Sequence, residues 1–284
     1  MEQKSNSEYL KERLFYLGFA DKLDAKLDEH LKAKTEKFQI PFQADFTRKP
    51  ANGEENNEKM PAEKKIVDFV IDFSKSKKDD IWFINKYQAT LRNEDPAKER
   101  THTFYINKGN GVAAREAFNM LEGREVYKKM FDKEGEQYHQ WQKIDFSKKD
   151  AYGNNELDTH HEKYGFNLEK ALMRHPIKEL SDPQRTSELI RSLEKGNRPQ
   201  VTVRIDDKEH KMYLEVAVHD RRVNVVDENG RKQFQGVREY KPEKGEKRSN
   251  SQEQSQGKDK AQKQEATSDD SDGPKRSKRK GMRV

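Results

Sequence analysis

The stretch that decides the fold opens with Asn167-Leu168-Glu169-Lys170-Ala171-Leu172-Met173-Arg174, which has the pattern of a short amphipathic helix. A proline-containing connection follows at 175–180, and a second helix is predicted from Asp182-Pro183 to Gly196. Asp182 is a favoured N-cap residue, and Pro183 suits the first helical position. The buried stripe of this second helix is expected to consist of Leu189, Ile190 and Leu193.

Alternating apolar residues follow the second helix and predict strands at 201–205, 212–218 and 223–225. Asn229-Gly230 is a strong signal for a type I′ turn. We therefore predict that residues 164–236 form a small α+β module, in which a helix pair packs on an antiparallel sheet, and that this module folds on its own. Its core is expected to contain Leu189, Leu193, Val203, Leu214 and Val216.

Residues 147–163 are polar and poor in apolar side chains, which is typical of a linker. Upstream of it, residues 1–146 predict a second α+β module that begins with a helical hairpin. The two helices carry apolar stripes formed by Leu10, Leu14 and Leu17 and by Leu23, Leu27 and Leu31. Gly18 is expected to end the first helix in a left-handed conformation.

The period of the pattern then changes to two, which predicts an antiparallel sheet. Residues 38–46 alternate, and Pro41 favours an edge position because proline has no N–H for a ladder. Residues 47–65 have the composition of a flexible loop. Three short runs then predict a meander, with Val67, Phe69, Ile71 and Phe73 on one face, Ile81, Phe83, Tyr87 and Leu91 on another, and Phe104 and Ile106 buried in the third.

A helix is predicted from about 112 to 121, with Gly123 at its end, after which comes a polar turn and then a strand that carries Trp141, Ile144 and Phe146. The last segment, 237–284, has almost no apolar residues and is predicted to be disordered, because it cannot bury enough surface to offset the entropy of ordering. The expected fold is therefore α+β, with two modules and a tail.

Composition limits the class of protein. The 284 residues are 31% hydrophobic and 39% charged, against typical values of about 45–50% and about 25%, so one core spanning the whole chain is not expected. The net charge is only +6, and the chain has no cysteine for a disulfide or a thiolate site. We find neither a signal-peptide pattern at the N-terminus nor an apolar run of membrane-spanning length, which predicts a soluble, cytoplasmic protein.

One glycine motif resembles a dinucleotide fingerprint. Gly109-Asn110-Gly111-Val112-Ala113-Ala114 matches G-x-G-x-x-A between a predicted strand and a predicted helix. The preceding strand alternates, whereas the strand of a dinucleotide fold is apolar throughout, so a simple turn is the favoured interpretation. A weaker alternative is that Lys108, Gly109 and Gly111 bind a single phosphate at the helix N-terminus.

Other polar groups do not form a convincing catalytic or metal site. His160-His161-Glu162 are adjacent residues whose side chains diverge, and no second ligand pair stands nearby, so no metal or other cofactor is predicted. Asp68 and Asp72 lie about 13 Å apart along one strand, too far for an acid–base pair. The sequence therefore predicts a protein that is not an enzyme, with a small-ligand or nucleotide-handling enzyme as the weakest alternative.

The basic end of the tail is the feature with the most direct functional content. A flexible polycation binds phosphates without reading base sequence. The residues expected to bind nucleic acid are Lys275, Arg276, Lys278, Arg279, Lys280 and Arg283. A second candidate is an aromatic platform on the sheet on which bases stack, consisting of Trp82, Tyr87, Phe104 and Tyr105, although alternation favours core positions for Tyr87 and Phe104.

Several motifs, taken in order, resemble a known group. They are Leu121-Glu122-Gly123-Arg124-Glu125-Val126-Tyr127-Lys128, Trp141-Gln142-Lys143-Ile144-Asp145-Phe146, residues 164–172, Pro176-Ile177-Lys178-Glu179-Leu180 and Leu193-Glu194-Lys195-Gly196-Asn197. This order resembles the domain-of-unknown-function families in accessory proteins of bacterial conjugative transposons, which are also appended to some type IA topoisomerases of such elements. The resemblance covers most of residues 8–235 but not the tail, and it carries no catalytic residue.

The resemblance implies a setting in mobile DNA. Together with the basic tail it predicts a non-enzymatic accessory protein of a mobile genetic element, which binds nucleic acid non-specifically through the tail and docks an unknown protein partner through its modules. The competing hypothesis is a protein-interaction adapter that does not bind nucleic acid.

Overall fold

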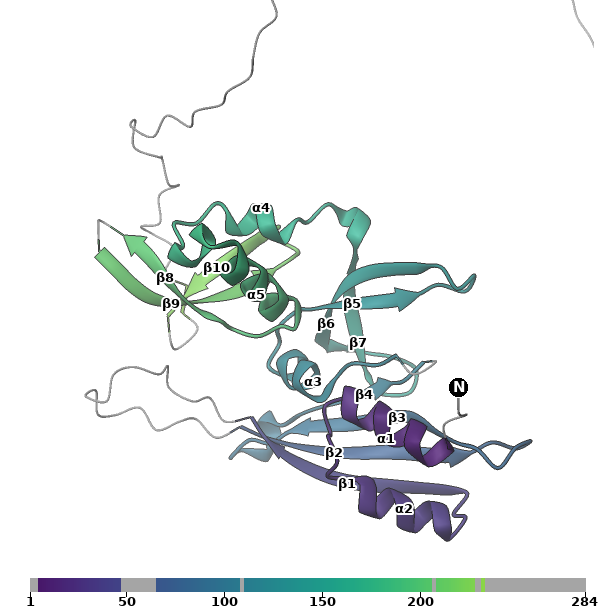
Figure 1. The fold of residues 1–284 in the computed structure, drawn as a ribbon. Helices are drawn as coiled ribbons and strands as arrows, with labels where there is room; N and C mark the ends of the chain where they lie inside the picture. The colour runs from purple at the N-terminus through teal and green to yellow at the C-terminus, as the bar shows by residue number, and fades with distance from the viewer. Residues whose placement is uncertain (1–4, 47–64, 108–109, 206–207, 228–230, 233–284) are drawn as a thin grey trace, which may run out of the picture. The chain divides into compact units, whose positions relative to one another are not determined.

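The chain forms an α+β structure in which helices pack on antiparallel sheets (Figure 1). The computed structural model describes residues 5–46, 65–107, 110–205, 208–227 and 231–232. These residues belong to one compact unit. The predicted fold class is confirmed.

The N-terminal sheet is a four-stranded meander in the order β1-β2-β3-β4. Its strands are β1 (Lys37–Asp45), β2 (Ile66–Lys75), β3 (Trp82–Leu91) and β4 (Arg100–Tyr105). β1 lies at one edge, as Pro41 predicted. Three α-helices accompany this sheet: α1 (Asn6–Tyr16), α2 (Asp24–Lys32) and α3 (Ala114–Leu121). A short 3-10 helix, η1 (Pro96–Lys98), connects β3 to β4.

The ends of α1 follow from local sequence. Ser5 and Glu8 form a reciprocal capping box at its start. At its end the N–H of Phe19 donates to the carbonyl of Leu14, and Gly18 adopts a φ of +86°, as predicted. This sharp stop turns the chain back toward the sheet and places Phe19 against Phe69 and Tyr87, at ring-centroid distances of 5.3 and 5.6 Å.

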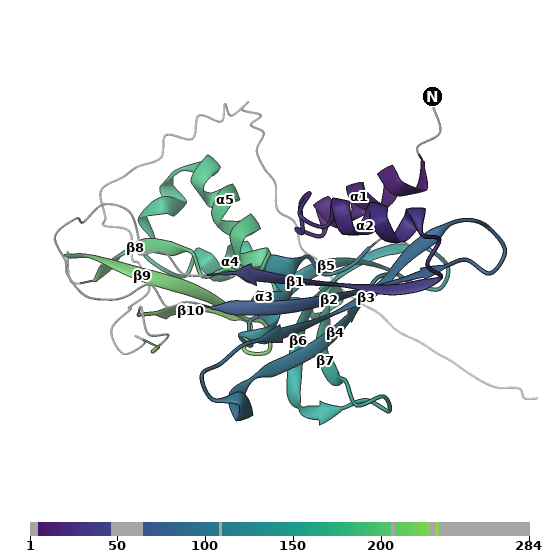
Figure 2. The same cartoon turned by 90° about the horizontal axis from the view of Figure 1, so that it is seen from below.

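One face of the sheet forms the first core, and α1, α2 and α3 cover it (Figure 2). Val67, Phe69, Ile71 and Phe73 of β2 all lie on this face and are buried, as predicted. The opposite face is polar: Gln43 donates to Asp68 at 2.7 Å, and Gln39 donates to Asp72 at 2.6 Å. The two aspartates therefore make cross-strand contacts and do not form a carboxylate pair.

The predicted inner face of β3 is only half correct. Tyr87 and Leu91 are buried as expected, but Ile81 and Phe83 are exposed, and Trp82 and Ile84 are buried in their place. The reason is a register shift: Asp72 pairs with Lys86, whereas Phe73 pairs with Ile84, so Asn85 is an extra residue. Because one extra residue reverses the alternation, the two ends of β3 bury opposite sets of positions.

A second sheet, in the order β5-β6-β7, follows α3. Its strands are β5 (Val126–Phe131), β6 (Gln137–Lys149) and β7 (Asn155–His161), and a 3-10 turn, η2 (Glu162–Tyr164), comes after them. The prediction of a linker at 147–163 is therefore wrong, because seven of these residues form β7. The polar turn predicted after α3 is also wrong at 126–131, which is β5.

The central strand β6 is buried on both faces in its middle. Ile144 belongs to the first core, whereas Trp141 belongs to a second core, where its ring lies 5.7 Å from that of Phe166. The second core also contains α4 (Leu168–Leu172), α5 (Pro183–Glu194) and the sheet β10-β9-β8. The bounds of its strands are β8 (Gln200–Ile205), β9 (Lys208–Ala217) and β10 (Arg222–Val226), and η3 (Lys178–Ser181) precedes α5.

The helix caps of the C-terminal part are as predicted. The Asp182 carboxylate accepts from the N–H of Gln184 at 2.8 Å, and Pro183 is the first residue of α5. Four of the five predicted core residues, Leu189, Leu193, Val203 and Leu214, are buried, and Val216 is half-buried. The participation of Trp141 means that this core extends beyond the predicted module of residues 164–236.

Polar contacts join α3 and the turn after it to the C-terminal part. The buried Asn119 amide donates to the carbonyl of Lys195 at 2.6 Å, and Arg124 donates to the carbonyl of Gly196 at 2.8 Å. Gly196 has a φ of +72°, and a Cβ at this position would lie 2.8 Å from the carbonyl oxygen of Glu125, so only glycine fits here.

Some predictions lie outside the described residues. These are residues 47–64 of the expected loop, the Asn229-Gly230 turn and the 237–284 tail with its basic residues. None of the helices in the described ranges is both long enough and apolar enough to cross a membrane.

Candidate functional site

The outer edge of β4 is covered by two asparagine side chains from the hairpin between β6 and β7. The side-chain amide of Asn154 accepts from the N–H of Thr103 at 2.9 Å and donates to its carbonyl at 3.0 Å. Asn155 donates to the carbonyl of Thr101 at 2.7 Å. The Asn154 amide thus pairs with both backbone groups of Thr103, much as a residue of a neighbouring strand would. A cavity lies on either side of this contact, and Asn155 lines both.

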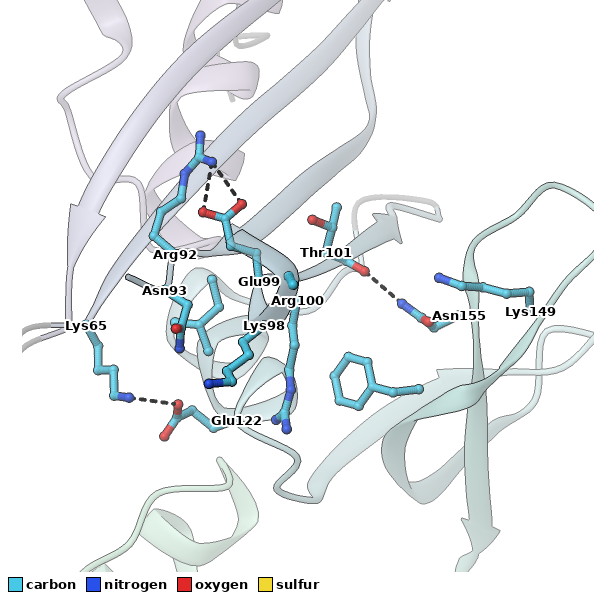
Figure 3. Close-up of a pocket in the computed structure, with 13 residues that line it drawn as sticks. Lys65, Arg92, Asn93, Lys98, Glu99, Arg100, Thr101, Glu122, Lys149 and Asn155 are labelled. Atoms are coloured by element: carbon cyan, nitrogen blue, oxygen red, sulfur yellow. Dashed lines mark hydrogen bonds and ion pairs between the residues drawn. The ribbon is translucent and has the colours of Figure 1, made fainter. Parts of the chain in front are cut away.

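The first cavity, here named the cationic cavity, has a volume of about 640 Å³ and is shown in Figure 3. It is lined by Lys65, Leu91, Arg92, Asn93, Ala97, Lys98, Glu99, Arg100, Thr101, Glu122, Phe146, Lys149 and Asn155. Five of these side chains are cationic and two are anionic. The cationic residues come from the start of β2, the β3–β4 connection, β4 and the end of β6.

Some of these cations are neutralised locally. Arg92 donates to both Asp68 and Glu99, and these hydrogen bonds raise the pKa of Arg92. Lys65 lies 3.8 Å from the Glu122 carboxylate. Figure 3 shows the Arg92–Glu99 and Lys65–Glu122 pairs in the wall of the cavity. In both pairs the carboxylate neutralises a positive charge that would otherwise attract an anionic ligand.

Arg100 and Lys149 are different. The Arg100 guanidinium donates to the carbonyl of Leu121 at 3.0 Å and lies 4.8 Å from the centre of the Phe146 ring. Neither Arg100 nor Lys149 forms an ion pair with a carboxylate of the described residues, and both are exposed. Their charges are therefore available to an anion that enters the cavity.

The second cavity, here named the apolar cavity, has a volume of about 560 Å³. Its lining comes from β4, from residues 110–112 and from β5, β6, β7 and their connections. The residues are His102, Thr103, Phe104, Tyr105, Asn107, Asn110, Gly111, Val112, Lys128, Lys129, Met130, Phe131, Asp132, Gln142, Asp150, Asn154, Asn155, Glu156 and Leu157.

His102 is the least expected member of this lining. It is only 3% exposed, and its ring lies 4.7 Å from that of Phe104 in an edge-to-face arrangement. Burial lowers the pKa of His102 to about 4, so the imidazole is neutral at physiological pH. Its Nδ1 atom is buried and has no hydrogen-bond partner among the described residues. A neutral imidazole has one nitrogen that donates and one that accepts, so the Nδ1 atom is left to bond to another group.

The structure does not support the predicted phosphate site at the start of α3. Lys108 and Gly109 lie outside the described residues, and Gly111 lines the apolar cavity. At the start of α3 the Glu116 carboxylate accepts from the N–H of Ala113 at 2.8 Å, and the N–H of Ala114 donates to the carbonyl of Leu17. A phosphate at this helix end would meet a carboxylate, which argues against binding there.

The aromatic platform on the sheet is also not assembled as predicted. Trp82, Tyr87 and Phe104 are buried in the first core, and the Tyr87 hydroxyl donates to the carbonyl of Val112 at 2.5 Å. Tyr105 alone is exposed, and it lines the apolar cavity. Its side chain is therefore the member of the platform that remains available to a ligand.

The histidine-rich segment is held by ring contacts. His160 lies against Tyr164, and His161 stacks on Tyr138 at 5.0 Å. Glu162 lies 3.4 Å from the Nδ1 atom of His139. In the described ranges, no three His, Cys, Asp or Glu side chains are grouped so that they could hold a metal ion.

The sequence did not reveal either cavity. A local signal for the cationic cavity was the charged run of residues 92–100, which supplies Arg92, Lys98 and Arg100. Lys65 and Lys149 come from positions far away in the chain.

Comparison with known proteins does not place the chain in a family. No family model matches it, no curated protein matches it, and no solved structure matches it. The resemblance to conjugative-transposon accessory proteins thus stays a prediction from the sequence.

Proposed function

We propose that this protein is a non-enzymatic accessory protein of a mobile genetic element that binds the phosphate backbone of nucleic acid. The observation that carries the proposal is the cationic cavity, where Arg100 and Lys149 have no carboxylate partner among the described residues. The basic end of the tail supplies further cations at Lys275, Arg276, Lys278, Arg279, Lys280 and Arg283. Clustered Lys and Arg side chains favour phosphates over neutral ligands.

The titratable groups support binding rather than catalysis. Burial raises the pKa of Glu125 to about 7, and its carboxylate accepts from the N–H of Val218 at 3.0 Å. His102 has a lowered pKa but contacts no acid or nucleophile by a hydrogen bond within the described part of the chain. General acid–base catalysis requires such groups to lie within hydrogen-bond reach of a reacting centre. The modules are further proposed to dock a protein of the same element.

Salt-dependent binding tests the proposal. We expect the full chain to bind duplex DNA with an affinity that falls as the salt concentration rises. In a plot of log binding constant against log salt concentration, each neutralised phosphate should contribute about −0.9 to the slope. Replacing Arg100 and Lys149 together by glutamine should flatten the slope by about 1.8, because two contacts are lost. Deleting residues 274–284 should flatten it by a further ~3.5–5.5, for four to six phosphates. Fluorescence anisotropy of a labelled duplex measures both changes.

The control variant replaces Lys163 and Lys170 by glutamine, which removes the same charge from exposed positions outside the cationic cavity. Its slope should match that of the unmodified chain. An unchanged slope in the Arg100/Lys149 variant, with a folded protein, would remove the cavity from the proposal and leave the tail alone. If the full chain does not bind DNA even at low salt, the protein-interaction adapter becomes the better hypothesis.

A further inference from the structure

The apolar cavity adjoins the cationic cavity, and Asn155 lines both. A ligand that spans the two cavities would contact two kinds of surface. One side offers the positive charges of Arg100 and Lys149, which form no ion pair within the described residues. The other offers apolar and aromatic surface with a few polar groups. A single-stranded nucleic acid has the same division, because its charged backbone carries neutral, planar bases.

Exposed apolar side chains line the apolar cavity. Tyr105 is 58% exposed, Leu157 is 40% exposed and Phe131 is 38% exposed. Met130 contributes a flexible thioether to the same lining. Aromatic side chains that keep this much exposed surface next to a cavity provide faces on which a planar ring can stack.

The charges around the apolar cavity favour a neutral group over a phosphate. The Lys128 ammonium is 2.6 Å from Glu116, and the Lys129 ammonium lies 5.7 Å from the centre of the Phe131 ring. Three carboxylates, those of Asp132, Asp150 and Glu156, also line the cavity. Since these acids outnumber the two lysines, an anion would gain nothing by moving there from the cationic cavity.

Polar groups in the lining could recognise the edge of such a ring. The His102 imidazole is buried, and its Nδ1 atom has no hydrogen-bond partner in the part of the chain that the structure describes. Gln142 is also buried, and within the described residues its amide donates only to the sulfur of Met130, at 3.4 Å. Sulfur is a weak acceptor, so this contact is easily exchanged for one to a ligand. An imidazole and an amide match the donors and acceptors on the edge of a base.

From this geometry we propose that the apolar cavity binds an unpaired nucleobase of a single strand whose backbone lies in the cationic cavity. The inference rests on the proposed function, which it deepens by naming single-stranded DNA or RNA as the preferred ligand. Tyr105 and Phe131 stack on the base, and His102 and Gln142 bond to its edge.

The test compares single-stranded and duplex oligonucleotides with the full chain by fluorescence anisotropy. The single strand should exceed the ~4–16 nucleotides that a small single-strand site covers. Tyr105→Ala and Phe131→Ala should each weaken single-strand binding about fivefold to a hundredfold, the usual range for loss of one stacking contact. Duplex affinity and its salt slope should not change. Tyr105→Phe should bind the single strand as tightly as the unmodified chain does, because the face of the aromatic ring is kept.

Matched controls are Tyr16→Ala and Phe83→Ala, which remove comparably exposed aromatic rings away from the apolar cavity. Neither should change single-strand binding. A DNA strand and an RNA strand of the same sequence distinguish the two sources of the base. The ligand is the strand that binds with the higher affinity and loses affinity in Tyr105→Ala. A strand with abasic positions should bind no better than duplex.

The two proposals fail in different ways. Loss of all binding by the unmodified chain at low salt overturns the proposed function. Binding that is retained, but is equal for single strand and duplex and unaffected by both alanine variants, overturns the base-binding inference and leaves the phosphate proposal standing.

Discussion

Replacing Leu193 by alanine is expected to lower the free energy of unfolding by about 2–5 kcal/mol. Leu193 is fully buried on the inner side of α5, in the core that it shares with Leu189 and Val203. Truncation removes its transfer free energy and leaves a cavity that the surrounding helix and sheet fill only in part. Urea denaturation followed by circular dichroism measures the change as a shift in the midpoint at constant slope.

Leu157→Ala is the matched control, because it removes the same atoms from a side chain that is 40% exposed on β7. Its effect should stay under about 1 kcal/mol, as for most surface substitutions. Equal effects for the two variants would contradict the burial of α5 against its sheet. Because Trp141 of β6 belongs to the same core, we expect tryptophan fluorescence, to which Trp82 also contributes, to change together with the loss of helix.

Stability is also expected to fall as the pH rises from about 5 to about 8, through Glu125. Burial raises the pKa of this carboxyl from 4.5 to about 7, and the hydrogen bond from the N–H of Val218 offsets part of that rise. Because the folded state holds the proton up to a higher pH than the unfolded state, ionisation favours unfolding between the two pKa values. The loss amounts to about 3 kcal/mol at most, at 1.36 kcal/mol per pKa unit.

Glu125→Gln should remove this dependence. Glutamine keeps an oxygen for the N–H of Val218 but carries no charge, so the variant should equal the unmodified chain near pH 5 and be more stable near pH 8. Thermal melting across this range measures the difference. The control is Glu169→Gln, an exposed carboxyl in the first turn of α4, which should leave the pH dependence unchanged. A pH dependence that persists in Glu125→Gln would assign it to other groups.

The sequence predicted best those features whose causes are local. The start of α5 follows from Asp182 and Pro183, and the end of α1 follows from Gly18, because caps involve residues only a few positions apart. The edge position of β1 followed from a property of Pro41 alone. The inner face of β2 was also predicted, since its alternation is unbroken.

Other features depend on partners that a single segment does not show. The extra residue at Asn85 becomes visible only when β3 is paired with β2, and it reverses the faces beyond it. β7 has the sequence Asn155-Glu156-Leu157-Asp158-Thr159-His160-His161, with a single aliphatic side chain, so no apolar period marks it as a strand. It is held through its pairing with β6 and through the Asn155 side chain.

The candidate site was beyond sequence reasoning for the same reason. The cationic cavity joins Lys65, Arg100 and Lys149, which the sheets bring together from three separate strands or their ends. His102 lines the apolar cavity together with residues of the lysine-rich strand β5, whose pattern did not predict a strand at all. Tyr105 was singled out as aromatic, and it is exposed on the face of β4 opposite to the buried Phe104.

The two edges of the N-terminal sheet also limit how copies of this protein can associate. On β1, Pro41 has no N–H to offer to an incoming strand, and on β4 the side chains of Asn154 and Asn155 occupy the main chain at Thr101 and Thr103. Growth of a sheet from one molecule to the next requires an uninterrupted row of free backbone donors and acceptors. Strand addition at either edge of this sheet is therefore disfavoured, which opposes the edge-to-edge route into aggregates.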